Sequence, residues 1–309
     1  PFGGPGAVGG AQPGVGNLLV DARAVAAVHD HARGVVDIDA AKQGLIVPLL
    51  VGPAATIAEV AKAKSIDIGG AQVIDAPNSR AAAAKAVELV RLGQAELVMK
   101  GSLHSDEVLG AVIAKETGLR TGRRLSHAFL MDVPTYQKVL IVTDAAINIA
   151  PTLEDKVDIC QNAIDLARTF GVERPKVAIL AAVETVNSKM PATLDAAALC
   201  KMADRGQIKA GLLDGPLAFD NAISREAAKT KGIASEVAGD PDILLAPDLE
   251  AGNMMAKMLS FLASADSAGL VLGARVPVIL RSRADSVRSR IASCAVAVLA
   301  AHARRQAPR

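Results

Sequence analysis

Short apolar runs alternate with amphipathic segments along most of the chain. Residues 45–51 and 243–246 are continuously apolar, and each run stops at glycine or proline. Residues 80–92 and 153–169 instead carry apolar side chains three and four positions apart. Buried strands that alternate with amphipathic helices are typical of an α/β protein, in which crossover helices connect parallel strands.

This rhythm changes at residues 118–124, GLRTGRR. The two predicted strands that follow, 125–132 and 138–143, are joined by a short segment around Pro134, which favours a hairpin. We therefore place a domain boundary near residue 124, and we expect the Gly/Pro-rich residues 1–23 to be irregular. The other predicted strands are 25–28, 45–51, 71–75, 96–99, 176–180, 208–213, 243–246 and 276–280. The predicted helices are 54–64, 80–92, 107–116, 153–169, 192–203, 220–229, 254–263 and a last one ending at His302.

The composition narrows the possible classes of protein. Aromatic residues are scarce, with no Trp, one Tyr and five Phe, so the core must consist of small aliphatic side chains. The net charge of +2 gives no reason to expect a nucleic-acid or membrane partner. The three cysteines lie far apart in apolar contexts. They indicate free thiols in a reducing cytoplasm.

Polar residues with possible chemistry cluster where the predicted strands end. Parallel strands bring their carboxyl ends to one edge of the sheet, where ligands bind. Dinucleotide, P-loop and nucleophile-elbow motifs are not found in a suitable context. Asp144, Asp214, Asp248 and Glu250 could ligate a cation, but carboxylates at turns are more often caps, so we predict no metal. The candidate substrate-binding residues at these strand ends are Lys100, Gly101, Arg124, Ser126, His127, Asp214, Glu250, Gly252 and Asn253.

Two of the candidates remain ambiguous from the residues alone. Ser282 and Arg283 follow the apolar run 276–280 and precede a helix, where the helix N-terminus and an arginine fork suit a phosphate. Arg283 could equally cap a surface turn. His127 could be a general base, although a histidine inside an apolar strand is more often structural.

Six segments resemble the phosphate acetyltransferase/phosphate butyryltransferase family. The resemblance runs in order from about Ala24 to the C-terminus. It is closest to the transferase module that follows an enoyl-CoA hydratase-like domain in some bacterial proteins, which would suit a chain that begins without Met. The segments are LIVPLLVGP (45–53), LVMKGSLHSDEVLGAVI (97–113), KVLIVTDAAINIAPTLEDKVDICQNAIDLA (138–167), LLDGPLAFDNAIS (212–224), ILLAPDLEAGNMMAKML (243–259) and VPVILRSRADS (276–286).

The resemblance implies two α/β domains around a cleft, as in isocitrate and isopropylmalate dehydrogenases, usually in a homodimer. Domain I would comprise residues 24–124 and 275–309, and domain II residues 125–274. The implied reaction exchanges acetyl or butyryl groups between CoA and phosphate by direct thiolate attack, with no cofactor. Ser282 and Arg283 would lie at the reacting groups, and Gly252-Asn253 matches a family turn.

The chain departs from the family pattern at two positions. Family members carry an arginine in the helix that follows a Lys-Gly or Ser-Gly turn, and the corresponding position here is near Gly110. Some also carry an aspartate that is proposed as the general base, and the corresponding position here is near Ser289. Asp285 and His127 are weak alternatives for the base, and the missing positive charge could come from Arg80, Arg120, Arg123 or Arg124. These gaps leave open a non-catalytic, acetyl-CoA-sensing and oligomerising module like the C-terminal region of large malic enzymes.

Overall fold

The computed structural model describes residues 23–28, 36–101, 103–280 and 286–306. Residues 1–22 of the segment predicted to be irregular lie outside this part of the chain, as do Ser282, Arg283 and Asp285. The described strand β1 (Arg23–Val28) begins at the last residue of that segment.

Strands and helices alternate through the first part of the chain, as the apolar pattern predicts. After β1 the elements are α1 (Val36–Lys42), β2 (Ile46–Gly52), α2 (Ala54–Ala63), β3 (Gln72–Asp75), α3 (Ser79–Arg91), β4 (Leu97–Lys100) and α4 (Ser105–Ile113). Asn78 caps α3, because its side chain accepts a hydrogen bond from the backbone N–H of Ala81.

The second part contains the predicted hairpin and further strand–helix units. Its elements are β5 (Ser126–Asp132), β6 (Leu140–Thr143), α5 (Leu153–Thr169), β7 (Lys176–Leu180), α6 (Pro191–Asp204), β8 (Leu212–Leu217), α7 (Phe219–Ile223), α8 (Arg225–Thr230), β9 (Ile243–Leu245), α9 (Leu249–Phe261), β10 (Asp266–Leu272), β11 (Val278–Ile279) and α10 (Val287–Gln306).

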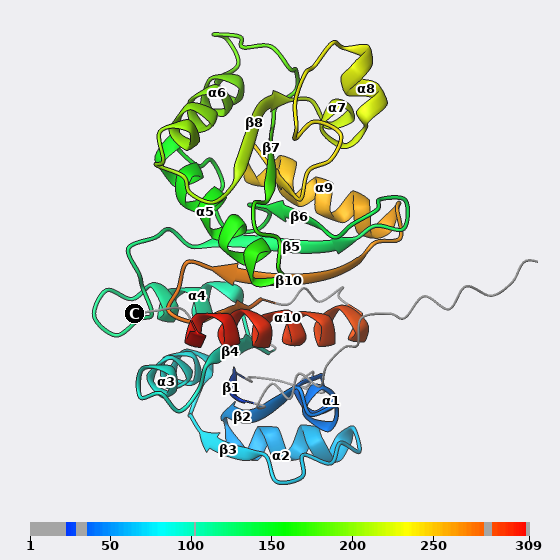
Figure 1. Ribbon diagram of the computed structural model, residues 1–309. Helices are drawn as coiled ribbons and strands as arrows, with labels where there is room; N and C mark the ends of the chain where they lie inside the picture. Colours follow the sequence, from blue (N-terminus) through cyan, green and yellow to red (C-terminus); the bar gives the residue numbers. More distant parts are fainter. Residues whose placement is uncertain (1–22, 29–35, 102, 281–285, 307–309) are drawn as a thin grey trace, which may run out of the picture.

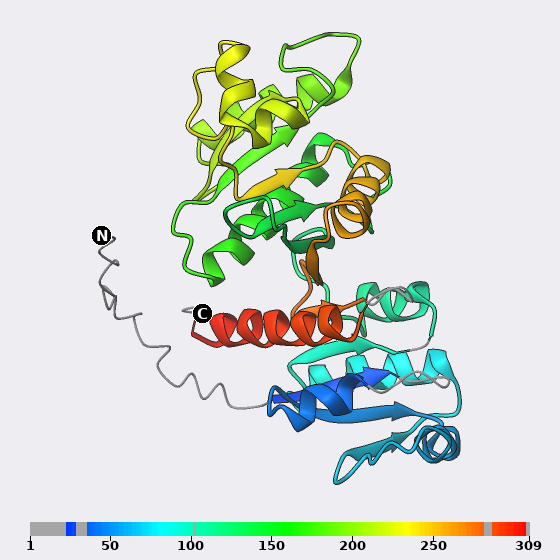
Figure 2. The same ribbon diagram turned by 90° about the vertical axis from the view of Figure 1, so that its right-hand side faces the viewer.

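All eleven strands described belong to one sheet, in the order β3-β2-β1-β4-β11-β10-β5-β6-β9-β7-β8. Neighbours at both ends of the sheet are parallel, whereas β11/β10, β10/β5 and β5/β6 are antiparallel. The mixed α/β class is therefore confirmed. Figure 1 shows β1–β4 with α1–α4 and α10 at one end, and β6–β9 with α5–α9 at the other, and Figure 2 shows the same two groups from the side.

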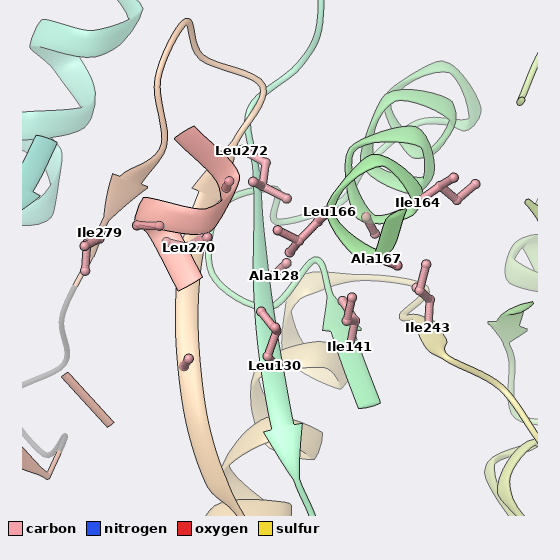
Figure 3. Close-up of a cluster of buried hydrophobic side chains, with 14 of the residues drawn as sticks. Ala128, Leu130, Ile141, Ile164, Leu166, Ala167, Ile243, Leu270, Leu272 and Ile279 are labelled. Atoms are coloured by element: carbon pink, nitrogen blue, oxygen red, sulfur yellow. The ribbon is translucent and has the colours of Figure 1, made fainter. Parts of the chain in front are cut away.

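The core is aliphatic, as the composition predicts. Its largest fully buried side chains are Leu, Ile and Met, among them Leu97, Ile243 and Leu270. Figure 3 shows part of this core, where Ala128, Leu130 and Ile141 of the sheet lie beside α5. None of the described helices is both long and apolar enough to cross a membrane.

Several predicted elements were wrong in place or extent. The strand expected at 208–213 is β8, and it runs through Asp214-Gly215-Pro216, which resemble a turn in sequence. Proline is tolerated there because β8 is the last strand of the sheet. The helix expected at 220–229 is interrupted at Ser224. Of the run 276–280, only two residues form strand β11.

Two elements were not predicted, and two helices start earlier than expected. The missed elements are α1 and β10. Helix α9 begins at Leu249 rather than residue 254, because Asp248 caps it by accepting a hydrogen bond from Ala251 N at 2.8 Å. Helix α4 begins at Ser105 and ends at Ile113, where residues 107–116 were expected.

Candidate active site

A cleft of about 490 Å³ opens on the face of the sheet that carries His127 and Phe129. It draws side chains from five elements, α4, β5, α9, β10 and α10, and from Leu280 and Ser286, the described residues on either side of 281–285. This volume is in the usual range of small-molecule sites, about 300–1,000 Å³. Its described lining includes Ser105, Asp106, Leu109, His127, Phe129, Ala146, Asn253, Lys257, Ser260, Asp266, Ser267, Leu280, Ser286 and Ser289.

Leu280 and Ser286 flank the five residues that contain Ser282 and Arg283, and both line the cleft. Ser286 also caps α10, because its hydroxyl accepts a hydrogen bond from Ser289 N at 3.0 Å. Since the described residues on both sides of Ser282 and Arg283 line the cleft, it is the candidate site for the chemistry that the sequence assigns to these two residues.

Asp144 organises the loop that forms one side of the cleft. It is 3 % exposed, and it accepts hydrogen bonds from the backbone N–H groups of His127 (3.1 Å) and Asn148 (3.0 Å). The same carboxylate accepts from Ala146 N, Ile147 N and the Asn148 side-chain amide. Five donors use the acceptor capacity of a carboxylate, so this buried charge is compensated by the loop itself.

Helix α9 lies very close to this loop. A Cβ placed on Gly252 would collide with the carbonyl oxygen of Asp144 and would also approach the Cβ of Ala246. The next residue, Asn253, donates from Nδ2 to the carbonyl oxygen of Ala145 at 2.9 Å. The Gly252-Asn253 pair thus lies within helix α9 rather than in a loop, and it attaches α9 to the wall of the cleft.

His127 lies in the cleft as a neutral side chain. The residue is 2 % exposed, and its ring packs edge-on against Phe129 with centroids 4.4 Å apart. Burial lowers the pKa of His127 from 6.5 to about 4, and the nearby Asp144 charge offsets only part of this effect. Its Nδ1 atom is buried and has no hydrogen-bond partner among the described residues. Such an orphan atom is unusual in a protein interior, and it makes a purely structural role for His127 less persuasive.

The ring of His127 occupies space left by Gly269 on the neighbouring strand. A Cβ at Gly269 would lie 3.1 Å from both Cε1 and Nε2 of the imidazole. Because β5 and β10 are paired along their length, this glycine fixes where the ring can lie.

Two predicted site residues instead connect the sheet to α5. Arg124 donates from Nε to Asn148 Oδ1 at 2.8 Å and pairs with Asp155 at 3.2 Å. Ser126 is fully buried and accepts a hydrogen bond from Asn162 at 3.0 Å. Successive residues of a strand point to opposite faces, so Ser126 lies on the face of β5 away from His127.

The remaining candidates do not line the described cleft. Asp214 is inside β8, which the order of the sheet places five strands from β10. Glu250 is exposed in the first turn of α9, and Gly252 is buried beneath it. Lys100 is the last residue of β4 and Gly101 follows it, and the Lys100 ammonium approaches the Gly101 carbonyl oxygen at 3.5 Å. Of the nine candidate substrate-binding residues, the cleft brings together His127 and Asn253.

The sequence analysis missed polar residues that do line the cleft. Lys257 lies one helical turn after Asn253, on the same face of α9. The sequence analysis could not use this spacing, because it placed the start of the helix at residue 254 and so left Asn253 outside it. Ser105 and Asp106 precede the helix expected at 107–116, but they form the first turn of α4 and line the cleft.

No group of three or more His, Cys, Asp or Glu residues suited to a metal occurs within the described ranges. Asp144 is fully engaged by its loop, and Asp248 caps α9. No disulfide joins the three cysteines, and burial raises the pKa of Cys200 to about 12 and that of Cys160 further. A raised pKa keeps both thiols protonated, which makes them poor nucleophiles.

The fold and the cleft define an α/β protein with a polar small-molecule site where two parallel blocks of one sheet meet. Residues 77–298 match the family model described as "Phosphate acetyl/butaryl transferase". Because this match covers well over half of the sequence, the chain belongs to the phosphate acetyl/butyryl transferase family. The prediction of family membership, and of a transferase, is confirmed.

Individual relatives agree with this assignment. The chain is 63 % identical to a phosphate acetyltransferase of Rhizobium meliloti over 87 % of its own length and 85 % of the relative's. It is 45 % identical to a phosphate butyryltransferase of Clostridium acetobutylicum, over 85 % of its own length and 87 % of the relative's. A branched-chain phosphotransacylase from Enterococcus faecalis V583 shares the fold with a TM-score of 0.79 and 29 % identity, covering 91 % of this chain and 99 % of that one.

Replacing Gly252 tests the contact between α9 and the Asp144 loop. We expect Gly252→Ala to lower the free energy of unfolding by about 1–3 kcal/mol, because the added methyl group meets backbone that cannot move aside. Gly110→Ala is the matched control, since Gly110 also lies in a helix but has open space at its Cβ position. It should raise stability by about 0.5–1 kcal/mol. Urea unfolding measures both changes, and equal shifts would contradict the proposed contact.

The lowered pKa of His127 predicts a loss of stability in mild acid. The unfolded chain takes up a proton near pH 6.5, whereas the folded protein does so only near pH 4. The stabilising contribution is therefore present above pH 6.5 and is lost as the pH falls toward 4, by about 2 kcal/mol at pH 5. Urea unfolding of the wild type and His127→Gln at pH 8 and pH 5 should show a smaller pH-dependent loss in the variant. An identical loss of stability between pH 8 and pH 5 in both proteins would show that His127 does not cause the pH dependence.

Proposed function

We propose that the protein transfers a short acyl group between CoA and inorganic phosphate in this cleft. The observation that carries the proposal is the 63 % identity, over most of both chains, to a protein named phosphate acetyltransferase. The position of the cleft supports it, because Leu280 and Ser286, the described residues on either side of Ser282 and Arg283, line its wall. Acyl-CoA, phosphate and acyl phosphate are then the substrates.

The reaction needs little covalent chemistry from the protein. The CoA thiolate attacks the carbonyl carbon of the acyl phosphate and forms the new S–C bond. The carbonyl oxygen carries the negative charge of the tetrahedral intermediate, and the C–O bond to phosphate then breaks with its electron pair going to phosphate. We infer that Arg283 neutralises phosphate and the developing oxyanion while Ser282 hydrogen-bonds the thiol or the carbonyl oxygen. Direct attack in a ternary complex requires no acyl-enzyme and no cofactor.

We assign supporting roles to three described residues of the cleft. Lys257 supplies a positive charge for the phosphate groups of the substrates, and Asn253 holds α9 against the Asp144 loop. His127 serves as a neutral hydrogen-bond partner rather than as the general base, because a group with a pKa near 4 is a weak base at neutral pH. We assign no residue as the general base, and Asp285 is the candidate that is left.

The wider expectations from the family resemblance stand as proposals. We expect two α/β domains as in isocitrate and isopropylmalate dehydrogenases, which the two parallel blocks of the sheet support. We also expect a homodimer in the cytoplasm.

Product formation from purified substrates tests the function. We expect the protein to form acyl-CoA from CoA and acetyl phosphate or butyryl phosphate, at a turnover in the ordinary enzymatic range of about 1–1,000 per second. Thioester absorbance follows the reaction. Tight binding of CoA without turnover of either acyl phosphate would instead favour the non-catalytic module that resembles the end of large malic enzymes.

Arg283→Ala tests the assignment of the reacting site. The variant should lose at least about a hundredfold in kcat, because the side chain acts on charge that develops in the transition state. Arg91→Ala is the control, since Arg91 is exposed at the end of α3 and does not line the cleft. Circular dichroism should show both variants folded. A kcat of Arg283→Ala close to that of the wild type would refute the role.

A further inference from the structure

A second pocket, with a basic lining, lies near the end of α10. It measures about 320 Å³, which is at the lower limit of small-molecule sites, about 300–1,000 Å³. Three arginines line it, Arg275 from the segment before β11, and Arg304 and Arg305 from the last turn of α10. Glu96 is the one carboxylate among its described lining residues, so three positive charges and one negative charge leave a net charge of +2. We call this space the basic pocket.

The basic pocket is separate from the cleft of the candidate active site. None of the described residues lines both spaces. Ser289 lines the cleft at the beginning of α10, whereas Arg304 lines the basic pocket near the end of the same helix. The rise of an α-helix places the backbones of these two residues about 22 Å apart. An anion held by Arg304 is therefore not the anion that the cleft would bind.

Two of the three guanidinium groups have no carboxylate partner in the described structure. Arg305 pairs with Glu96. Arg304 instead donates to the carbonyl oxygen of Ala274 at 2.7 Å, which uses one of its five N–H donors. The side chain of Arg275 makes neither a hydrogen bond nor an ion pair with a described residue. Arg275 and Arg304 therefore have donors available for a bound anion.

The electrostatic surroundings of Arg304 favour a negative ligand. Burial, followed by the positive charge of Arg123, lowers the pKa of Arg304 below its usual value, and Asp165 offsets part of this effect. A lowered pKa means that the surroundings disfavour the charged guanidinium. A bound anion would remove this penalty, because it supplies the opposite charge beside the arginine.

The basic pocket adjoins the place where the chain enters and leaves the middle of the sheet. Residues 118–124 lead into β5 and residues 273–277 lead out of β10, and an isolated antiparallel bridge joins these segments at Arg120 and Ala274. Helix α10 contacts both α1 and α5, and Figures 1 and 2 show it where the two groups of strands meet. A ligand in the pocket would contact the outgoing segment and α10 together.

We propose that the basic pocket is an effector site for a small molecule that carries a diphosphate group. A guanidinium donates two parallel N–H bonds to phosphate oxygens, and Arg275 and Arg304 both have donors to offer. A diphosphate brings at least two negative charges, which offset the net charge of the lining. Because the ligand joins the outgoing segment to α10, its binding stabilises this joint of the folded protein.

Isothermal titration calorimetry with inorganic pyrophosphate and with ADP tests the proposal. Arg275→Gln is the main variant, because its side chain makes no described polar contact whose loss would disturb the fold. Arg91→Gln is the matched control, since it removes the same charge from an exposed position that does not line the pocket. Lys257→Gln removes a positive charge from the cleft instead. Urea unfolding verifies that each variant is folded.

The wild type should bind at least one of the two probes with a Kd below about 1 mM. Arg275→Gln should weaken this binding at least about tenfold, because it removes charge-assisted hydrogen bonds. Arg91→Gln and Lys257→Gln should stay within about twofold of the wild type, because neither residue lines the basic pocket. The bound probe should also raise the urea midpoint of the wild type. Tighter binding of ADP would identify a nucleotide as the ligand, and tighter binding of pyrophosphate would identify the free diphosphate.

Three results would overturn the inference. The first is the absence of binding of both probes to the wild type. The second is equal weakening by Arg275→Gln and Arg91→Gln, which would show a general attraction to a positive surface. The third is binding that Lys257→Gln abolishes and Arg275→Gln does not, which would place the anion in the cleft. These measurements need no turnover, so their failure leaves the proposed acyl transfer intact, and a protein without acyl transfer could still bind the effector.

Discussion

The candidate site depends on the buried carboxylate of Asp144. Five donors, from β5 and from the loop after β6, converge on this one group. A buried charge is tolerated only when it is fully compensated, so the loop must keep this conformation for the protein to fold. The same loop presents its backbone carbonyls to α9, where Gly252 permits close contact and Asn253 adds a hydrogen bond. The conformation of the Asp144 loop therefore determines where His127 and Asn253 lie in the cleft.

Periodicity was enough to predict the α/β class, the hairpin of β5 and β6, and the limits of α5. The prediction failed where a short sequence pattern suggested a different local structure from the one observed. Asp214-Gly215-Pro216 resemble a turn, yet they continue an edge strand. Gly252-Asn253 resemble a loop, yet they lie in α9, because the helix cap is Asp248 and the glycine serves a tertiary contact. Local sequence does not contain the neighbour that makes such a glycine necessary.

The site was predicted less completely than the fold for a related reason. Polar residues at strand ends were all assigned to one cleft, but strands of a long sheet end at different places. Asp214 is far along the sheet, and Arg124 and Ser126 attach β5 to α5. Lys257 became visible only once the true start of α9 placed it on the face of Asn253. Which strand ends meet is decided by strand order, and single-sequence patterns contain little of that information.

The return of the chain through β10 and β11 has a consequence for how the protein is made. Strand β11 lies between β10 and β4, and α10 packs over β10 close to α1. The block that contains the first four strands is therefore completed by β11 and α10, which are synthesised after the block from β5 to β9. The block from β5 to β9 has all of its strands earlier in synthesis, so it can fold as a unit while the first block still waits for its final strand and helix. The second block in the sequence can therefore complete its fold before the first.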